Sequence, residues 1–146
     1  MKYLLSFLVA LAFLLNACSQ SEEKVPDNIL KTFSQKFPKA SEVKWGKEND
    51  KEWEAEFLVA NINYSANFST EGSWLETEYT ADSNNLPAVI DSVISNQFNG
   101  YKIDKLEISE KPDNKFWEFE LSNPNQKIEV ILNTEGNLIK QEKLEK

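Results

Sequence analysis

The sequence contains neither histidine nor arginine, and its one cysteine is Cys18. Enzymes most often use histidine to accept and donate protons near neutral pH, so the usual general acid and base is missing. Zinc sites in proteins are built mainly from histidine and cysteine, and one cysteine leaves no plausible ligand set for this metal. A single thiol also excludes a disulfide within the chain. We therefore expect no histidine-based catalysis, no zinc site and no disulfide framework.

Other catalytic chemistry has little support in the sequence. The hydroxyls of Ser41, Ser73 and Ser92 have no identifiable base, and their cap or turn contexts account for them. A pair of carboxylates can hydrolyse glycosides, and Glu54 with Glu76 is a conceivable pair. Nothing in the sequence indicates a cleft or a raised pKa for either carboxyl. We expect a protein that is not an enzyme, with no catalytic residue, no cofactor and no bound metal.

The charge of the chain is strongly one-sided. All 16 basic residues are lysine, against 24 aspartates and glutamates, and the formal net charge is −8. An acidic protein repels nucleic acid and anionic lipid headgroups. The sequence therefore predicts no nucleic-acid partner, and it predicts that a membrane would be contacted only through a lipid anchor.

The first 18 residues have the pattern of a bacterial lipoprotein signal. Lys2 supplies a positive charge, residues 3–15 form an apolar run, and Ala17 precedes Cys18, where a signal peptidase would cut and a diacylglycerol would be attached. A run of about 13 residues is too short to span a bilayer, which takes roughly 20. We predict a lipoprotein signal peptide over residues 1–17 and lipidation of Cys18. The alternative is an ordinary cleaved secretory signal near which Cys18 falls by chance.

A short polar segment, residues 18–24, follows the predicted cut and is expected to act as a flexible tether. Its Ser-Gln-Ser-Glu-Glu stretch resembles the acidic signal that some diderm bacteria use to send lipoproteins to the outer face of the outer membrane. A solvated spacer explains the same residues equally well. The predicted location is the cell envelope, lipid-anchored, in the periplasm or at the surface of the outer membrane.

The rest of the chain contains an internal repeat, in which residues 25–78 recur with drift as residues 86–142. The tripeptide Thr70-Glu71-Gly72 returns unchanged as Thr134-Glu135-Gly136, and Trp53-Glu54 returns as Trp117-Glu118. Self-similarity of this length indicates two copies of one structural unit. We predict a first repeat over residues 25–82 and a second over residues 83–146, which together form one domain.

Each repeat is predicted to fold as one helix followed by four strands. A proline opens each helix, and apolar residues recur at helical spacing along one stripe, which favours a core face. A membrane-surface or partner-binding helix is the alternative, but it would be expected to carry a basic polar face. Alternating segments separated by short turns favour antiparallel strands. The fold class is α+β, a curved antiparallel sheet with two helices packed on one face. The predicted strands are 42–47, 52–59, 62–69, 74–80, 101–109, 116–122, 127–133 and 138–143.

The segment Asp82-Ser83-Asn84-Asn85 joins the two repeats and is rich in oxygen ligands. It lacks the glycine and the distant glutamate of a calcium-binding loop. We expect it to cap the second helix instead.

Several short motifs occur along residues 25–146: Val25-Pro26, Phe37-Pro38-Lys39-Ala40, Val43-Lys44-Trp45, Trp53-Glu54-Ala55-Glu56-Phe57, Gly72-Ser73-Trp74-Leu75-Glu76-Thr77-Glu78, Leu86-Pro87 and Thr134-Glu135-Gly136-Asn137-Leu138. Together they resemble the PepSY-like, β-lactamase-inhibitor-like (BLIP-like) domains of exported bacterial proteins, and the resemblance covers residues 25–146. It implies a tandem helix-on-sheet fold whose uncovered sheet face is free for binding. Fold alone does not establish function.

Strand alternation predicts which side chains lie on the uncovered face. In residues 52–59 the aromatic side chains face the helix and the glutamates face outward; in residues 74–80, Trp74 joins the carboxylates if Leu75 points inward. A wet tryptophan surrounded by acids suits a basic protein or peptide. A merely solvated acidic face is the alternative. The candidate partner-binding residues are Glu54, Glu56, Trp74, Glu76 and Glu78.

The favoured function is a membrane-anchored, non-enzymatic binding protein, such as an inhibitor or modulator of an exported protein, that uses this open face. The partner is expected to be a protein or peptide that the sequence does not identify. Two alternatives stay open at this point. One is a module that binds a small molecule or a divalent cation between the two repeats, and the other is a structural component of the envelope.

Overall fold

The structure, a computed structural model, describes residues 24–144. The predicted signal peptide, Cys18 and all but the last residue of the predicted tether lie outside the described residues. The elements follow one another along the chain as α1 (Asp27–Lys36), β1 (Ser41–Asn49), β2 (Glu52–Val59), β3 (Ile62–Ser69), β4 (Trp74–Thr80), the 3-10 turn η1 (Ser83–Asn85), α2 (Ala88–Gln97), β5 (Lys102–Glu110), β6 (Lys115–Ser122), β7 (Lys127–Asn133) and β8 (Leu138–Leu144).

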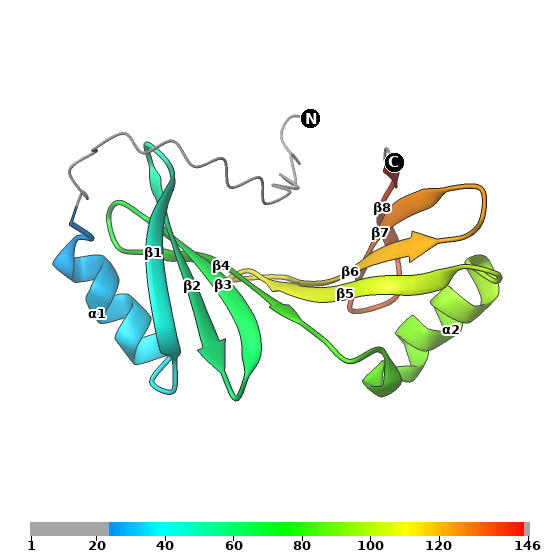
Figure 1. Cartoon of the computed structure of the whole chain (residues 1–146), viewed down its shortest axis with the longest axis horizontal. Helices are drawn as coiled ribbons and strands as arrows, with labels where there is room; N and C mark the ends of the chain where they lie inside the picture. Colours follow the sequence, from blue (N-terminus) through cyan, green and yellow to red (C-terminus); the bar gives the residue numbers. More distant parts are fainter. Residues whose placement is uncertain (1–23, 145–146) are drawn as a thin grey trace.

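All eight strands belong to one antiparallel sheet, in which each strand pairs with the next along the chain. The β4–β5 pair joins the two halves through four residue pairs, from Thr77↔Glu110 to Thr80↔Glu107. The two helices lie at opposite ends of this twisted, curved sheet and on the same side of it (Figure 1). The predicted α+β fold, with both helices on one face, is confirmed.

The helices begin and end in matching ways. Pro26 and Pro87 precede α1 and α2 with nearly identical backbone angles, φ −59° and ψ 142° against φ −57° and ψ 142°. At the other ends, the N–H groups of Phe37 and Phe98 donate to the carbonyls of Phe33 and Ile94, at 2.8 and 3.0 Å. A proline before the first turn fixes the entry of the chain and needs no amide partner.

The prediction that Asp82–Asn85 caps the second helix is wrong. Asp82 instead accepts a hydrogen bond from the backbone N–H of Asn84 at 2.9 Å, which stabilises the 3-10 turn ahead of α2. The helix itself starts after Pro87 without any side-chain cap. A polar residue followed by Leu86-Pro87 cannot sit next to the first turn, because the proline already occupies that place.

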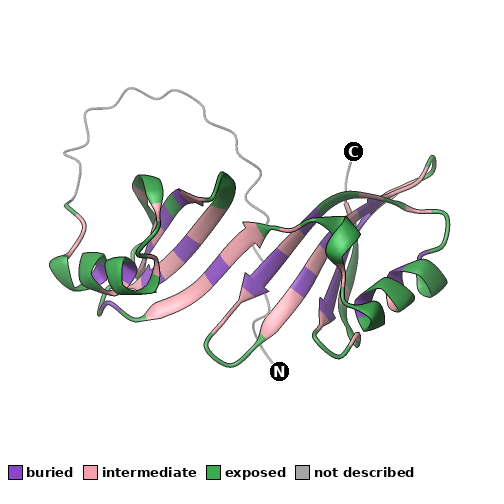
Figure 2. Ribbon diagram, turned by 90° about the horizontal axis from the view of Figure 1, so that it is seen from below, coloured by how far each residue is buried: buried purple, intermediate pink, exposed green. Residues whose placement is uncertain are grey.

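Two separate hydrophobic clusters form the core, one under each helix, and buried side chains alternate along β2, β3 and β6 (Figure 2). Burying one large apolar side chain contributes about 1.5–3 kcal/mol. The rings of Tyr64 and Tyr79 stack with centroids 4.8 Å apart; Tyr64 packs against the cluster under α1, and Tyr79 packs against the cluster under α2. The first cluster comprises Ile29, Phe33, Trp53, Ala55, Phe57, Ala66 and Phe68, and the second comprises Ile90, Ile94, Phe98, Leu106, Ile108, Trp117, Phe119, Leu121, Ile128, Val130 and Leu132.

The repeated Thr-Glu-Gly tripeptide forms the turn on which each helix rests. Gly72 and Gly136 adopt positive φ values of 88° and 82°, which favour glycine. A Cβ atom on Gly72 would lie 2.9 Å from Asn28 Nδ2, and one on Gly136 would lie 3.1 Å from a methyl of Val89. The glycines therefore allow each helix to approach the turn closely. Among residues 24–144, neither helix is long and apolar enough to cross a membrane.

Candidate functional site

The face of the sheet opposite the helices, called the free face here, carries the four predicted glutamates. In the ladder, Asn67 of β3 lies directly opposite both Glu54 and Glu76, and Ser65 lies directly opposite both Glu56 and Glu78. Residues that pair across an antiparallel ladder point to the same side of the sheet. The structure thus brings Glu54, Glu56, Glu76 and Glu78 together on the free face in two short rows.

Trp74 does not join them, and the expectation that it does is wrong. A bulge in β4 leaves Leu75 unpaired, so Trp74 lies opposite the buried Phe68 while Glu76 lies opposite Asn67. One extra residue changes which side the following side chains occupy. Trp74 therefore packs against the first hydrophobic cluster, on the side of the helices.

The surroundings of Trp74 explain how a half-exposed indole is accommodated there. Its Nε1–H donates to Thr77 Oγ1 at 2.8 Å, and Thr77 is 3 % exposed. Lys36 of α1 places its Nζ atom 3.4 Å from the ring centroid, within the range of a cation–π contact. The indole is thus part of the packing of α1 and not a ligand platform on the free face.

The aromatic side chain on the free face is Phe116, which sequence reasoning missed. It lies directly opposite Ser109 in the β5–β6 ladder, and Ser109 lies opposite Glu78 in the β4–β5 ladder. Lys111 Nζ is 5.8 Å from the Phe116 ring centroid. Phe116 and Glu118 flank the buried Trp117, so strand alternation was a signal that could have placed Phe116 on the free face.

Glu76 is held in place from the neighbouring strand. Ser109 Oγ donates to Glu76 Oε1 at 2.5 Å, and Lys111 Nζ lies 3.2 Å from the same oxygen. Ser109 is fully buried. This carboxylate is therefore part of the joint between β4 and β5 as well as part of the free face.

The second repeat adds carboxyls that the sequence analysis did not single out. Glu107 of β5 lies directly opposite Glu118 of β6, and Glu120 lies directly opposite Glu129 of β7. Like charges that face each other across a ladder are destabilising. Glu118 is the counterpart of Glu54 in the repeat, so the repeat was the signal that could have identified it.

Glu78 and Glu118 have the most perturbed acidities of the described carboxyls. Burial, followed by the negative charges of Glu76, Glu118 and Glu107, raises the pKa of Glu78 from 4.5 to about 7. Burial, followed by the charges of Glu76 and Glu129, raises the pKa of Glu118 to about 7 as well. Burial also raises the pKa of Glu54, with help from Glu48 and Glu56. The middle of the free face therefore changes its charge near neutral pH.

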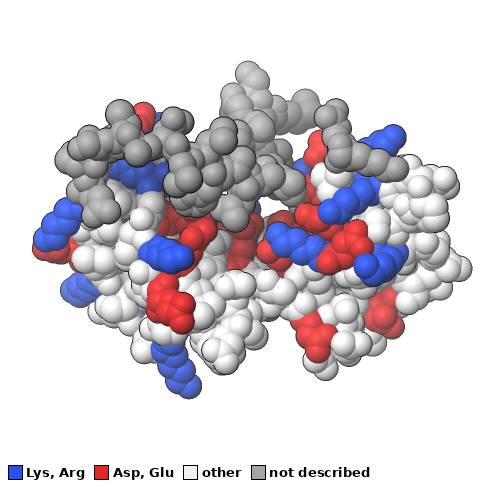
Figure 3. All heavy atoms as spheres, in the orientation of Figure 1, with Lys and Arg blue, Asp and Glu red and all other residues white. Residues whose placement is uncertain are grey.

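Lysines neutralise only part of this surface. The ion pairs on it are Lys111–Glu76 at 3.2 Å, Lys105–Glu107 at 2.8 Å, Lys140–Glu129 at 2.6 Å, Lys140–Glu142 at 2.7 Å and Lys127–Glu120. Within residues 24–144, Glu54, Glu56, Glu78 and Glu118 form no salt bridge with lysine. In the view of Figure 1, acidic and lysine side chains gather over the middle of the molecule (Figure 3).

A shallow hollow of about 370 Å³ opens beside these carboxyls, lined by Glu56 and Glu78 of the first half, Glu107 of the second, and Lys44, Asn63 and Ser65. In the part of the chain that the structure describes, no three acidic or cysteine side chains converge in a way that could hold a metal ion. The arrangement can attract cationic groups, but its oxygens are spread along the strands.

Residues 51–140 match the family described as "Putative beta-lactamase-inhibitor-like, PepSY-like". The chain belongs to this PepSY-like family. The match covers more than half of the sequence and confirms the resemblance noted from its motifs. No curated protein matches the sequence.

Several solved structures share the fold of this PepSY-like chain. A BLIP-like protein from Bacteroides fragilis is 19% identical with a TM-score of 0.76, over 84% of this chain and 88% of that one. A DUF2874 family protein from Bacteroides ovatus is 21% identical with a TM-score of 0.74, over 83% and 89%. One from Bacteroides eggerthii, described among "putative periplasmic proteins", is 14% identical with a TM-score of 0.74, over 83% and 90%. At these identities the likeness extends to the fold alone.

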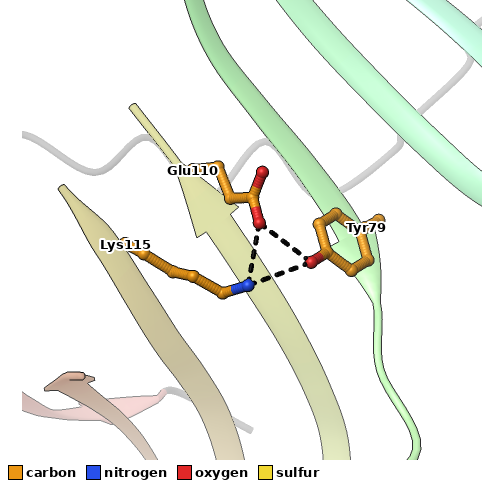
Figure 4. A network of polar contacts seen from close by, with 3 residues as sticks. All are labelled: Tyr79, Glu110 and Lys115. Atoms are coloured by element: carbon orange, nitrogen blue, oxygen red, sulfur yellow. Dashed lines mark hydrogen bonds and ion pairs between the residues drawn. The ribbon is translucent and has the colours of Figure 1, made fainter. Parts of the chain in front are cut away.

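A second polar group of the PepSY-like chain consists of Tyr79, Glu110 and Lys115 (Figure 4), and it lies on the side of the joint that faces the helices, because Glu110 is opposite the buried Thr77. Tyr79 donates its hydroxyl to Glu110 at 3.0 Å, and Lys115 donates to Glu110 at 2.8 Å and to Tyr79 at 3.3 Å. Burial opposes ionisation of Glu110, but the bonds from Lys115 and Tyr79 hold its pKa below the ordinary value. The three side chains bond to one another and come from three neighbouring strands, so this group ties β4, β5 and β6 together.

Proposed function

We propose that this chain is a lipid-anchored protein of the cell envelope that binds a basic protein or peptide on the free face of its sheet and so inhibits or modulates an exported protein. The proposal assigns the binding role to Glu54, Glu56, Glu76 and Glu78 from the first repeat, and to Glu107 and Glu118 from the second. Trp74 is not part of it.

The observation that carries this proposal is the excess of carboxylate on the free face. Glu54, Glu56, Glu78 and Glu118 make no ion pair with lysine among the described residues, so lysine leaves their charge unbalanced. A surface with one sign of charge attracts partners of the opposite sign and repels wrong ones. A cationic partner would lower the repulsion that these carboxyls now exert on one another.

The family and the fold support a binding role over catalysis. The family description names an inhibitor-like domain, and a similar fold is found in a BLIP-like protein. The sequence has no histidine to act as acid or base. We therefore assign the free face to recognition and assign no chemical step to the chain.

The location rests on the sequence pattern at Cys18, the predicted lipidation site. A fold of the same kind occurs in a protein described as periplasmic. A lipid on Cys18 would hold the protein at a membrane and leave the free face available to exported proteins.

The proposal is tested by crosslinked capture from native membranes with the full chain. The test variant is Glu54→Lys/Glu56→Lys, which reverses two charges on the free face. The matched control is Asp50→Lys/Asp91→Lys, which makes the same change in charge at two exposed positions, one in the β1–β2 turn and one in α2. We expect the native chain and the control to capture the same basic exported protein, and the test variant to lose it.

The thermal melts of both variants show whether a loss of capture reflects the surface or the fold. If the test variant keeps the melting temperature of the native chain and still captures the same proteins, the free face is not the binding surface. Where a partner is captured, its activity is then measured with and without the chain, because inhibition or modulation is the last part of the proposal.

A further inference from the structure

The two outer strands of the sheet, β1 and β8, differ in how well they could pair with another strand. Neither has a second partner strand among the described residues. The β1–β2 ladder has register shifts between Ser41 and Lys44 and between Lys47 and Asn49, and Glu42 has a positive φ of 54°. Bulges of this kind bend an edge and obstruct further pairing. The edge formed by β1 is therefore blocked.

The edge formed by β8 is regular over most of its length. It pairs residue by residue with β7 from Lys140 to Leu144, and its one irregularity lies at Ile139, near its start. Leu138 and Ile139 are 46% and 43% exposed. An exposed, regular edge with apolar side chains is a template for another strand.

Lysines on an edge usually hinder such pairing, but the central lysine of β8 is drawn inward. Lys140 Nζ lies 2.6 Å from Glu129 of β7 and 2.7 Å from Glu142 of its own strand. The side chain is 24% exposed. Because the ammonium is held over the sheet, it does not project across the outer edge.

The sequence of β8, Leu-Ile-Lys-Gln-Glu-Lys-Leu, is complementary to itself when it is read in the antiparallel direction. A two-fold axis perpendicular to the sheet keeps both free faces on one side and places one residue opposite its own copy. With Gln141 on the axis, Lys140 lies opposite Glu142 of the second copy, and Leu138 lies opposite Leu144. With Lys140 or Glu142 on the axis, like charges meet instead. Charge therefore selects the register centred on Gln141.

We propose that the β8 edge is a self-association surface, on which a second copy of this chain pairs antiparallel with its own β8 about a two-fold axis at Gln141. The sheets of the two copies then continue into one another, and their acidic free faces lie side by side. The interface of one seven-residue strand is smaller than that of a stable dimer, so the association is weak and concentration-dependent. Anchoring both copies on one membrane would raise their effective concentration.

The register is tested by disulfide trapping in the full chain expressed in its membrane. Residues opposite each other in an antiparallel pair have Cα atoms about 4.5–5.5 Å apart, which suits a disulfide. Gln141→Cys should therefore give a crosslinked dimer on oxidation. Lys143→Cys, two positions away, should give little, and the parent chain controls for crosslinks through Cys18. Equal crosslinking at positions 141 and 143, or none at 141, overturns the proposal.

Charge reversal tests the same register without cysteine. Lys140→Glu and Glu142→Lys each place like charges opposite one another at two symmetric positions, and each should weaken self-association about tenfold or more in sedimentation equilibrium. A mixture of the two variants restores opposite charges at both positions, so it should form a mixed dimer as readily as the parent forms its own. If the native chain stays monomeric at every concentration, or if the mixture associates no better than the single variants, the proposal is wrong.

Discussion

Ser109 donates a 2.5 Å hydrogen bond to Glu76 across the β4–β5 pair, and Ser109 is fully buried. This bond lies at the joint between the two halves of the sheet, where the two hydrophobic clusters do not meet. Lys111 binds the same carboxylate on the free face, and the group of Tyr79, Glu110 and Lys115 ties the opposite face. Polar side chains thus hold together two halves that have separate cores.

The first prediction concerns this bond. Ser109→Ala removes the donor and leaves the half-buried Glu76 carboxylate with one partner fewer, so it should lower the free energy of unfolding by about 1.5–3 kcal/mol. Ser95→Ala, on the exposed side of α2, is the control and should change it by less than about 0.5 kcal/mol. Urea unfolding monitored by tryptophan fluorescence measures both. Equal effects of the two variants would show that the bond does not stabilise the joint.

The second prediction follows from the pKa of about 7 for Glu78 and Glu118. Both values lie above the ordinary 4.5, so the folded chain holds protons that the unfolded chain releases between these limits. The stabilisation that these bound protons give the folded chain is therefore fully present below pH 4.5 and is lost as the pH rises through 7. The free energy of unfolding falls by at most on the order of 3 kcal/mol for each group. Urea unfolding at pH 5 and pH 8 measures this decline.

Glu78→Gln and Glu118→Gln are the variants that isolate this effect. Each replaces a titrating carboxyl by a neutral side chain of the same shape, so each should reduce the decline in stability between pH 5 and pH 8. The control is Glu110→Gln. Because the pKa of Glu110 is lowered, its contribution to stability is lost only as the pH falls below 4.5, so this variant should leave the decline between pH 5 and pH 8 unchanged. A decline of unchanged size in both glutamine variants would refute the assignment.

How far the sequence predicted this fold depends on the range of the interactions involved. The bounds of β2, β3, β4 and β7 agree with the predicted strands to the residue. Alternation and turn residues are local signals, and here they were sufficient. The bulge at Leu75 depends on how β4 meets β3, which no local pattern reports, and for this reason Trp74 was placed on the wrong face.

The candidate site was predicted in part for the same reason. The glutamates of β2 and β4 were assigned to one face from alternation within each strand. The raised pKa values of Glu78 and Glu118 arise from burial and from charges that lie largely on neighbouring strands, so predicting them required the assembled sheet. Glu118 could have been predicted because the repeat relates it to Glu54. Phe116 could have been predicted because it lies two residues before Glu118 on the same face of the strand.

The third prediction uses three glycines with similar backbone angles. Gly72, Gly100 and Gly136 all have a φ between 82° and 88°, but a Cβ on Gly100 would meet nothing within 4 Å, whereas one on Gly136 would lie 3.1 Å from Val89 and Val93 methyls. Gly100→Ala should therefore cost about 1–2 kcal/mol from backbone strain alone. Gly136→Ala should cost more, because α2 must also move away from the turn. Thermal melts that rank Gly100→Ala as equal or worse would contradict this account of the turn.

The fourth prediction separates the hydroxyl of Tyr79 from its ring. Tyr79→Phe keeps the stack with Tyr64 but removes the hydroxyl that donates to Glu110 and accepts from Lys115, so it should destabilise the chain by about 0.5–1.5 kcal/mol. Tyr64→Phe keeps the same stack and serves as the matched control, with little expected effect. Chemical unfolding of the two variants measures the difference, and no difference would mean that the group of three adds nothing to the joint.

The most direct test of the proposed binding role is site-specific photocrosslinking in living cells. A photoreactive residue at Asn63, which is exposed beside Glu56 and Glu78 in the hollow, is compared with one at Ser95 on the exposed side of α2. The account predicts that Asn63 forms an adduct with a basic exported protein, that high salt weakens it, and that Ser95 does not form it. Absence of any adduct at Asn63, or the same adducts at both positions, would contradict the claim that the free face binds a partner.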